Sequence, residues 1–387
     1  MLKKKILNSF LKQLENLLYG TLTITTPTGK TYIIEGSIES EPKADFIILN
    51  SRAITNLVAK GDIGFAESYR DGDFQSEDLA TLLTIALKNA DIFKNYLYGS
   101  FFSNITAQVL YYLRSNTVKG SKRNIHEHYD LGNEFYSLWL DKTMSYSSAI
   151  FNNAHEPLQF AQLNKYDRII DSLGKKTGNL LEIGCGWGGF AERAMHHADY
   201  KIKGITISNE QYKFASERLG NKAKISLEDY RIQSGQYDNI VSIEMFEAVG
   251  KKYWPIYFNK IKALLKHKGK AVVQTITMEE LYFERYRKTG DMVRSFIFPG
   301  GMLPSVSKFK QEAANAGLQV TDIYAFGQDY VTTLKHWLDS FENNLDKVLL
   351  LGFDRSFICV WRFYLSACIA AFSVGRTNVI QAEIYHA

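Results

Sequence analysis

LLEIGCGWGG, residues 180–189, decides the fold. Its first four residues, 180–183, are mostly apolar, as in a buried parallel strand. The glycines that follow tolerate positive φ angles and let the backbone approach a ligand closely. A helix that begins between Trp187 and Ala191 would point its N-terminal amides at that ligand. The stretch predicts a strand, a cofactor-binding turn and a helix; the alternative is a turn that uses its glycines for packing alone.

The spacing of the glycines distinguishes between cofactors. A dinucleotide-binding turn has the pattern G-x-G-x-x-G, with the third glycine one turn into the helix. Here residues 184–189 are G-C-G-W-G-G, and Glu182 precedes them. An acidic side chain at this place repels phosphate and suits a cationic ligand. The pattern E-x-G-x-G-x-G resembles motif I of the class I methyltransferases, whose cofactor S-adenosylmethionine carries an ammonium and a sulfonium group.

Strands and helices alternate after the glycine turn, which predicts an α/β fold with a doubly wound, Rossmann-like sheet. Its ligand is expected at the carboxyl ends of the strands, where Asp229 can accept the adenine amino group and Tyr230 can stack on the ring. The predicted elements are a strand at 203–208, a helix at 209–219 with Ser208 or Asn209 as N-cap, a short strand ending at 228–231, and a strand at 237–243.

Length and composition set the outer bounds. A chain of 387 residues is too long for one ordinary core, so two domains are expected. The formal net charge of +5 is too small for a dedicated nucleic-acid binder, although it favours contact with an anionic membrane. Cys185, Cys359 and Cys368 are too few and too scattered for a disulfide framework or a zinc site, which indicates a reducing compartment.

The N-terminal third is predicted to form a smaller α+β domain, residues 1–118, ahead of a catalytic domain at 119–387. A basic amphipathic helix at its start either lies on a bilayer or covers a domain core. The polar, basic stretch 119–123 is the expected linker. The other expected features are strands at 21–26 and 31–35, a turn-rich stretch at 61–72, and, near the C-terminus, an apolar helix at 357–374 that we interpret as buried because it contains Arg362.

Several further blocks, which occur in family order, resemble the cyclopropane-fatty-acid-phospholipid synthase family. They are residues 126–133 (HEHYDLGN), 146–149 (YSSA), 182–189, 204–211, 245–250 (MFEAVG) and 297–305 (IFPGGMLPS). The resemblance implies an S-adenosylmethionine-dependent methyltransferase that acts on the double bond of unsaturated acyl chains in membrane phospholipids. It further implies a cytoplasmic enzyme, peripheral on the inner face of the membrane, that can form a homodimer. No nucleic-acid partner is expected.

The resemblance also implies the catalytic residues. A bound bicarbonate ion would serve as base, held by Glu247, Tyr330, the backbone of Ile276 and the residues at positions 148 and 274. The family usually has Cys and His there, whereas this chain has Ser148 and Gln274. Glutamine forms hydrogen bonds but does not titrate. Cys368 matches a cysteine once favoured as catalytic, but its apolar helix suits an inert thiol.

For the cofactor site, the glycine pattern and the resemblance together give a larger set. Its members are Tyr146, Ser147, Glu182, Gly184, Cys185, Gly186, Gly188, Thr206, Ile207, Ser208, Gln211, Asp229, Tyr230 and Arg231. His126 and His128 alternate in a polar stretch, yet no third metal ligand lies at a suitable spacing. We therefore predict hydrogen bonding for these histidines, and no metal.

Three alternatives remain open from the sequence. The methylated double bond yields a cyclopropane ring or, if a different proton is lost, a methylene- or methyl-branched chain. A methyltransferase for a headgroup or another small molecule would share the cofactor fold, but the aromatic and aliphatic run at 283–298 suits an acyl chain better. A catalytically silent lipid-binding protein would not need the intact glycines and Glu247.

Overall fold

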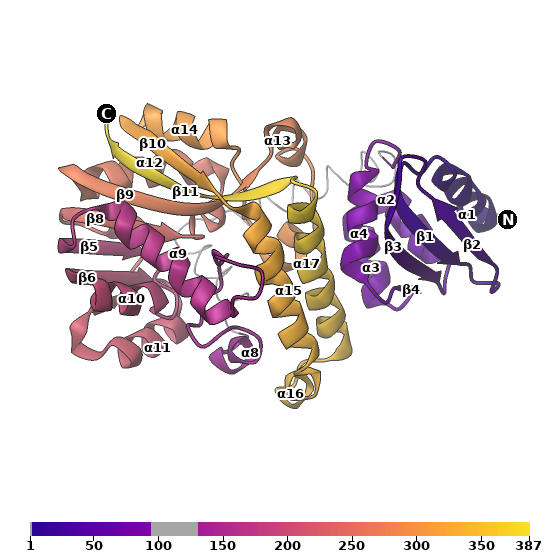
Figure 1. Cartoon of the computed structure of the whole chain (residues 1–387), viewed down its shortest axis with the longest axis horizontal. Coiled ribbons are helices and arrows are strands. Elements are labelled where there is room, and N and C mark those ends of the chain that lie inside the picture. Colours follow the sequence, from indigo (N-terminus) through magenta and orange to yellow (C-terminus); the bar gives the residue numbers. More distant parts are fainter. Residues whose placement is uncertain (1, 94–130) are drawn as a thin grey trace. The chain divides into compact units, whose positions relative to one another are not determined.

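The computed structural model describes residues 2–93 and 131–387, and the chain divides into two compact units (Figure 1). The first consists of Met1–Leu113, Glu284–Pro299 and Glu342–Arg376, and the second of Arg114–Phe283, Gly300–Phe341 and Thr377–Ala387. The domain boundary predicted at 118/119 lies outside the described residues, as do the linker at 119–123 and both His126 and His128. These points stay predictions.

The second unit is built on a seven-stranded sheet with the order β10-β11-β9-β8-β5-β6-β7. The strands β5 to β9 pair in parallel, whereas β10 and β11 are antiparallel. The chain runs from β5 outward to β7 and then returns to β8 on the other side of β5, so the strand order reverses between β5 and β8. The bounds are β5 Thr177–Ile183, β6 Asp199–Thr206, β7 Lys224–Leu227, β8 Tyr237–Ile243, β9 Leu265–Met278, β10 Leu318–Ala325 and β11 Thr377–His386.

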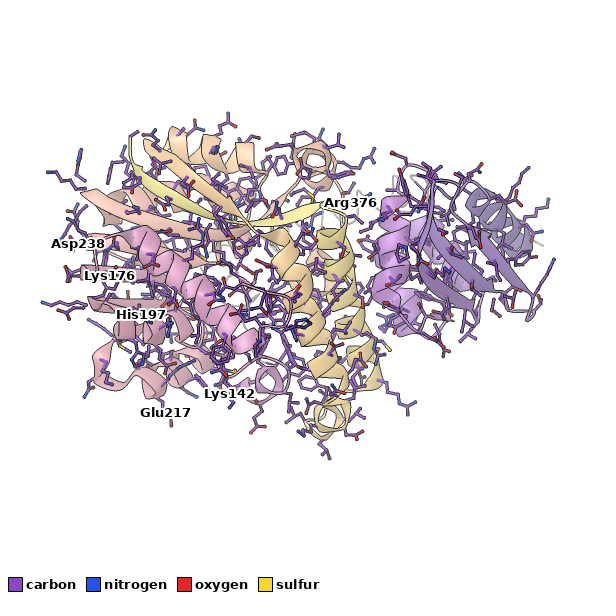
Figure 2. All side chains as sticks on the ribbon, in the orientation of Figure 1. Lys142, Lys176, His197, Glu217, Asp238 and Arg376 are labelled. Atoms are coloured by element: carbon purple, nitrogen blue, oxygen red, sulfur yellow. The ribbon has the colours of Figure 1, made fainter. Side chains whose placement is uncertain are left out.

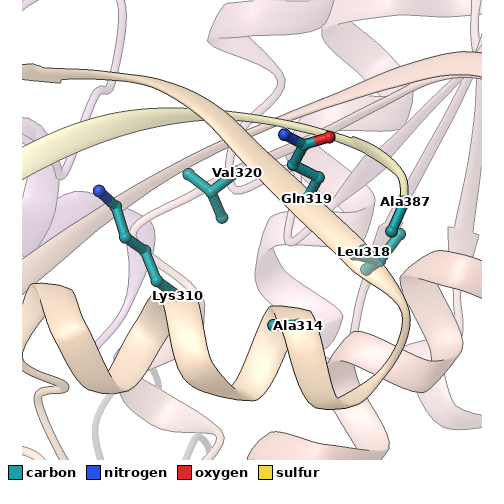
Figure 3. Close-up of a pocket in the computed structure, with 6 residues that line it drawn as sticks. All are labelled: Lys310, Ala314, Leu318, Gln319, Val320 and Ala387. Carbon is teal, nitrogen blue, oxygen red and sulfur yellow. The ribbon is translucent and has the colours of Figure 1, made fainter.

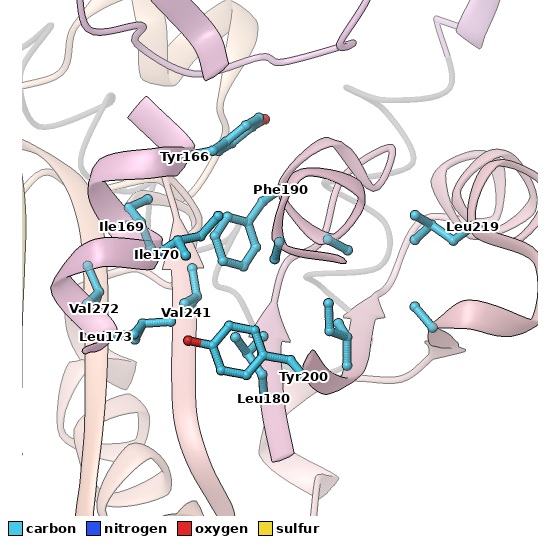
Figure 4. Packing of buried hydrophobic residues seen from close by; sticks show 14 residues of the cluster. Tyr166, Ile169, Ile170, Leu173, Leu180, Phe190, Tyr200, Leu219, Val241 and Val272 are labelled. Carbon is cyan, nitrogen blue, oxygen red and sulfur yellow. The ribbon is translucent and has the colours of Figure 1, made fainter. Parts of the chain in front are cut away.

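Helices cover both faces of this sheet, because right-handed crossovers running in opposite directions place their helices on opposite faces. The helices α9, α10 and α11 share a core with Leu180, Val241 and Val272 of the strands (Figure 4). The helix α12 contacts α14 and β9. The helices are α8 Asn133–Ser137, α9 Leu158–Leu173, α10 Gly189–His197, α11 Asn209–Leu219, α12 Trp254–Leu264, α13 Glu280–Tyr286, α14 Val306–Asn315 and α15 Gly327–Glu342.

The structure confirms the predicted α/β fold with a doubly wound sheet. The predicted strand at 237–243 is β8, and the predicted helix at 209–219 is α11, whose N-cap Ser208 accepts a hydrogen bond from the Gln211 amide. Exposed polar and charged side chains such as Lys176, His197 and Glu217 lie on the surface of this unit (Figure 2). The antiparallel strand β11 was not predicted.

The first unit contains a four-stranded sheet with the order β2-β1-β3-β4 and an aromatic core. Phe65 stacks on Phe74 with 4.2 Å between ring centroids and lies 6.1 Å from Phe363 of α17, a helix that packs against α3 and α4. The elements are α1 Leu2–Leu14, β1 Tyr19–Thr25, β2 Thr31–Glu35, β3 Glu39–Ile48, α2 Arg52–Lys60, α3 Asp62–Arg70, β4 Phe74–Gln75, α4 Leu79–Lys88, η5 Val293–Ile297, α16 Leu345–Leu350 and α17 Arg355–Ser373.

The prediction of a turn-rich stretch at 61–72 is wrong, because most of it is helix α3. Gly61 and Gly72 have positive φ angles of 64° and 74° and lie at the two ends of the helix. Gly64 lies inside it, where a Cβ atom would come within 2.2 Å of the Asn56 carbonyl oxygen. This glycine therefore permits close packing against α2 and does not mark a turn.

The helix α17 corresponds to the apolar helix predicted at 357–374. It is long and apolar enough to cross a membrane by length and composition, and 50% of its most apolar window is buried. A helix buried in a protein core passes the same test. Its packing against α3 and α4 fits the buried interpretation.

Candidate active site

The glycine turn connects β5 to α10 at the point where the strand order reverses, which is where open α/β sheets bind their ligands. Gly184, Gly186 and Gly188 have φ angles of 80°, 53° and 85°. The amides of Gly184 and Cys185 donate to the Ile205 carbonyl of β6 at 2.9 and 3.0 Å, which fixes the turn. A Cβ atom on Gly184 would meet Met245, whereas one on Gly186 would meet nothing within 4 Å. Gly186 thus borders open space.

Glu182 lies near the end of β5 and is only 2% exposed. Its Oε2 atom has no hydrogen-bond partner among the described residues. Burial raises the pKa of this carboxyl well above its ordinary value, while the positive charge of Lys165 lowers it. A buried acidic oxygen without a partner, four residues before Gly186, fits the cationic methionine end of S-adenosylmethionine.

Lys165 was not identified from the sequence. It lies on α9 with 0% exposure, and its Nζ donates to Ser147 Oγ and to Gln162 Oε1, both at 2.6 Å. Burial lowers the pKa of Lys165 to about 7. A lysine on the apolar face of a helix, in line with Ala161 and Ile169, was the signal that could have found it.

The turn after β6 holds three of the predicted cofactor residues together. The Thr206 hydroxyl donates to Gln211 Oε1 at 2.8 Å, and the Ser208 amide donates to Thr206 Oγ1 at 3.2 Å. Ile207 lies between them and is half-buried. These contacts order the N-terminus of α11 at the carboxyl edge of the sheet, next to the glycine turn.

Asp229 and Tyr230, which were predicted to bind the adenine, follow β7 and contact other side chains of the protein. The Asp229 carboxylate accepts hydrogen bonds from Arg231 Nε at 2.9 Å and Nη2 at 2.6 Å. Tyr230 packs edge-on against Tyr257 with 5.6 Å between centroids, and its hydroxyl has no partner in the described part of the chain. The Asp229–Arg231 pair can still border the adenine, and the predicted roles of all three residues stay predictions.

Aromatic rings surround Tyr146, which was predicted to lie at the methionine end of the cofactor. The centroid of Tyr146 lies 5.6 Å from Tyr136, 5.3 Å from Trp139 and 5.4 Å from Trp337. These rings come from α8, from the loop after it and from α15. Together they form an apolar wall that excludes water from this end of the site.

Two carboxylates follow β8, of which only Glu247 was predicted from the sequence. The other, Glu244, accepts hydrogen bonds from the Ser148 amide at 2.8 Å, Gln274 Nε2 at 2.8 Å and the Tyr330 hydroxyl at 2.7 Å. Glu244 also has a φ angle of 47°, in the left-handed region. Glu244 could have been identified from its position directly after an apolar strand, because the same criterion identified Glu247.

Glu247 accepts a hydrogen bond from the Ile276 amide through Oε1, and its Oε2 has no hydrogen-bond partner among residues 2–93 and 131–387. Burial and the neighbouring Glu244 raise the pKa of Glu247 to about 8. Burial also raises the pKa of Glu244, but the bonds from Tyr330, Ser148 and Gln274 lower it. Both carboxyls thus have raised pKa values, and the three donors to Glu244 favour its ionised form.

The groups predicted to hold bicarbonate are brought together, but the Ser148 amide, Gln274 and Tyr330 already donate hydrogen bonds to Glu244. The Ser148 hydroxyl is directed at the Ala149 carbonyl at 3.1 Å, and Gln274 Oε1 accepts a bond from Gln381 at 3.0 Å. The Ile276 amide, which was expected to bind the bicarbonate, donates instead to Glu247. The residues at this position do not fit an additional bicarbonate ion, because the donors that it would need have a carboxylate of the chain as acceptor.

Cys368 lies on α17 of the first unit, whereas all the other candidate residues belong to the second. Burial, and to a smaller extent Asp291, raises the pKa of this thiol to about 12. A thiol that stays protonated is a poor nucleophile. We therefore expect Cys368→Ala to retain methyl transfer within about threefold of the unsubstituted protein, as for a small, partly buried hydrophobe, in a radiolabelled-methyl assay. A complete loss of turnover in folded protein would contradict this.

A surface hollow of about 340 Å³ lies between α14 and the edge strand β10 (Figure 3). It is lined by Lys310, Ala314, Leu318, Gln319, Val320 and Ala387. It contains none of the candidate site residues.

In the part of the chain that the structure describes, no three His, Cys, Asp or Glu side chains are placed to hold a metal ion.

Comparison with known proteins identifies the family. The family model for mycolic acid cyclopropane synthetase matches residues 116–382. The chain is 34% identical over 369 residues to the tuberculostearic acid methyltransferase UfaA1 of Mycobacterium tuberculosis, covering 88% of this chain and 83% of that protein. It is 32% identical over 338 residues to the cyclopropane-fatty-acyl-phospholipid synthase of Escherichia coli (strain K12), covering 87% and 86%.

Among solved structures, the mycolic acid cyclopropane synthase CmaA1 complexed with SAH and CTAB matches with a TM-score of 0.63 at 29% identity. The match covers 68% of this chain and 97% of that one. The family match includes the glycine turn, Glu244, Glu247 and Tyr330. The chain therefore belongs to the mycolic acid cyclopropane synthetase family and is an S-adenosylmethionine-dependent methyltransferase of the cyclopropane-fatty-acyl-phospholipid synthase type.

Proposed function

We propose that this enzyme methylates the double bond of an unsaturated acyl chain in a membrane phospholipid and converts it into a cyclopropane ring. The observation that carries the proposal is the pair of buried carboxylates after β8, with Glu247 Oε2 lacking a partner. An alkene that takes up a methyl group becomes a carbocation, which a fixed anion stabilises. A substrate amine or hydroxyl would be the nucleophile itself and would not need this pair.

The chain's own residues bind, orient and shield the reactants. The glycine turn and Glu182 hold the cofactor, which supplies an electrophilic methyl group when bound. The aromatic wall around Tyr146 keeps water away from a cation that water would otherwise quench. Because an alkene is a weak nucleophile, close positioning provides most of the acceleration.

The reaction balances as follows. The π electrons of the alkene form a bond to the methyl carbon, and the electron pair of the broken carbon–sulfur bond stays on sulfur. The acyl chain now carries a positive charge on the second alkene carbon. A proton then leaves the new methyl group, and the electron pair of that C–H bond closes the three-membered ring.

A branched product is the second candidate. The chain is 34% identical to a protein named tuberculostearic acid methyltransferase, and Gln274 cannot titrate as the usual histidine can. If a hydride first moves from the methyl-bearing carbon to the cationic carbon, loss of a proton from the methyl group gives a methylene branch. If the proton leaves the methyl-bearing carbon directly, the product is a methyl-branched alkene, and in neither case does a ring form. The site geometry supports the shared cation and leaves the choice of product to the experiment below.

Labelled cofactor distinguishes these products. Purified protein is incubated with unsaturated phospholipid vesicles and S-adenosylmethionine that carries a trideuterated methyl group, and the acyl esters are analysed by mass spectrometry. We expect two retained deuterons in a product that resists mild hydrogenation, as a ring does. A methylene branch also retains two but takes up hydrogen, and a methyl branch retains all three. No label in the acyl chains would contradict the proposal.

We also propose that the enzyme works as a peripheral protein on the cytoplasmic face of the membrane, as a homodimer. Its net charge of +5 and the exposed leucines at 349–351, of which Leu350 is 86% exposed, support contact with an anionic bilayer. Co-sedimentation with vesicles and sedimentation velocity test the two statements separately.

A further inference from the structure

We propose that the carboxylate of Glu244 is the built-in anion of this enzyme, which faces the acyl carbocation and takes its proton, so that the reaction needs no bicarbonate. The inference rests on the proposed function, and it assigns a catalytic role to a residue that neither the glycine pattern nor the family blocks had indicated.

Three hydrogen-bond donors converge on the carboxylate of Glu244. The Ser148 amide precedes α9, Gln274 lies on β9 and Tyr330 lies on α15, yet all three direct a hydrogen at one carboxylate over distances of 2.7 to 2.8 Å. Three preorganised donors from separate segments define a site for a negative charge. They are also the groups expected to bind a free anion, and Glu244 occupies that position as part of the chain.

The backbone of Glu244 has an unusual conformation. Its φ angle of 47° lies in the left-handed region, where a residue with a side chain is strained by about 1–2 kcal/mol. Its amide donates to the Gln274 carbonyl at 2.8 Å, which helps to hold this conformation. Such strain persists where surrounding structure over-determines it, most often at functional sites. Glycine would adopt the same backbone without strain.

The charged groups around Glu244 affect how readily it ionises. The titratable groups around Glu244 are Glu247, Lys165 and Tyr330. Burial raises the pKa of Glu244, whereas its hydrogen bonds and the positive charge of Lys165 lower it; burial and Glu244 raise the pKa of Glu247 to about 8. A carboxylate has about four acceptor positions, and the three donors use three of them. One position therefore remains for the proton that leaves the acyl chain.

In the balanced step, the proton from the new methyl group moves to a carboxylate oxygen of Glu244 while its bonding electrons close the ring. Glu244 becomes neutral as the cation disappears, so the summed charge of the two reacting groups stays zero. The proton passes to water when the product leaves. No oxidant, reductant or second anion is needed.

The test combines Glu244→Gly with added small anions. In carbonate-free buffer, we expect the unsubstituted enzyme to be indifferent to added bicarbonate and Glu244→Gly to lose about 10²-fold or more in rate, as for a lost general base. Bicarbonate or formate should restore at least about tenfold of that loss, because the variant keeps the three donors and gains space. Glu244→Gln should be equally slow but gain nothing, since its amide fills the space.

A binding measurement separates this inference from the proposed function. Nuclear magnetic resonance with ¹³C-labelled bicarbonate should show binding to Glu244→Gly and none to the unsubstituted protein, whatever the substrate is. S-adenosylhomocysteine titration reports whether each variant is folded. Bicarbonate dependence of the unsubstituted enzyme, or full anion-free activity of Glu244→Gly, would overturn the inference. Absence of lipid methylation by the unsubstituted enzyme would instead refute the proposed function.

Discussion

Replacing Gly186 by leucine is expected to abolish the binding of S-adenosylmethionine while leaving the protein folded. A side chain at this position meets no protein atom within 4 Å and would extend into the space that the cofactor requires. We expect the dissociation constant for S-adenosylhomocysteine to rise by at least about 100-fold, which corresponds to about 2.7 kcal/mol, in isothermal titration calorimetry. Methyl transfer should fall accordingly.

Gly220 provides a matched control for this prediction. It has the same φ angle of 53° and also has no protein atom within 4 Å of an added Cβ, but it lies after α11 and is not part of the glycine turn. The strain of a side chain in this conformation, about 1–2 kcal/mol, is therefore common to both variants. If Gly220→Leu weakens cofactor binding as much as Gly186→Leu does, the open space at Gly186 is not the cofactor site.

Replacing Glu247 by glutamine is expected to lower the rate of methyl transfer by about 10²-fold, because the site then has one carboxyl group in place of a pair that can share a proton. The amide keeps an acceptor for the Ile276 N–H, but its NH₂ group replaces the oxygen that has no partner among the described residues, and it neither gives up nor takes up a proton. The measurement is the single-turnover rate with saturating cofactor. Unchanged affinity for S-adenosylhomocysteine shows that the site is intact, and an unchanged rate would exclude Glu247 from the chemistry.

The same substitution should stabilise the protein at alkaline pH. The pKa of Glu247 rises from an ordinary 4.5 to about 8 on folding, so the folded state holds an extra proton between these values. Stability consequently falls as the pH rises through this window, and it levels off above about 8. Glutamine removes this loss. We expect the difference in thermal midpoint between the variant and the unsubstituted protein to grow across the window, and a constant difference would contradict the raised pKa.

The sequence predicted those elements whose patterns involve residues close together along the chain. The strand β8 and the helix α11 follow from apolar runs and from the N-cap Ser208, whose hydrogen-bond partner is only three residues away. The glycine turn follows from a pattern within ten residues. Such features depend on neighbours along the chain, which a sequence displays directly.

The parts that could not be predicted depend on distant contacts. The donors to Glu244 lie 96, 30 and 86 positions away along the chain, and no local pattern unites them. The helix at 62–70 was hidden because its glycine serves a contact with Asn56 and not a turn. The assignment of residues 284–299 and 342–376 to the first unit likewise depends on tertiary packing, which no hydrophobic period encodes.

The discontinuity of the first unit has a consequence for biosynthesis. Phe65 and Tyr69 of α3 pack against Phe363 of α17, which the ribosome makes almost 300 residues later. During translation these aromatic faces stay uncovered until α17 has emerged from the ribosome. Nascent chains that stop before α17 should consequently associate with chaperones and be degraded by proteases, and the emergence of α17 ends this vulnerable period.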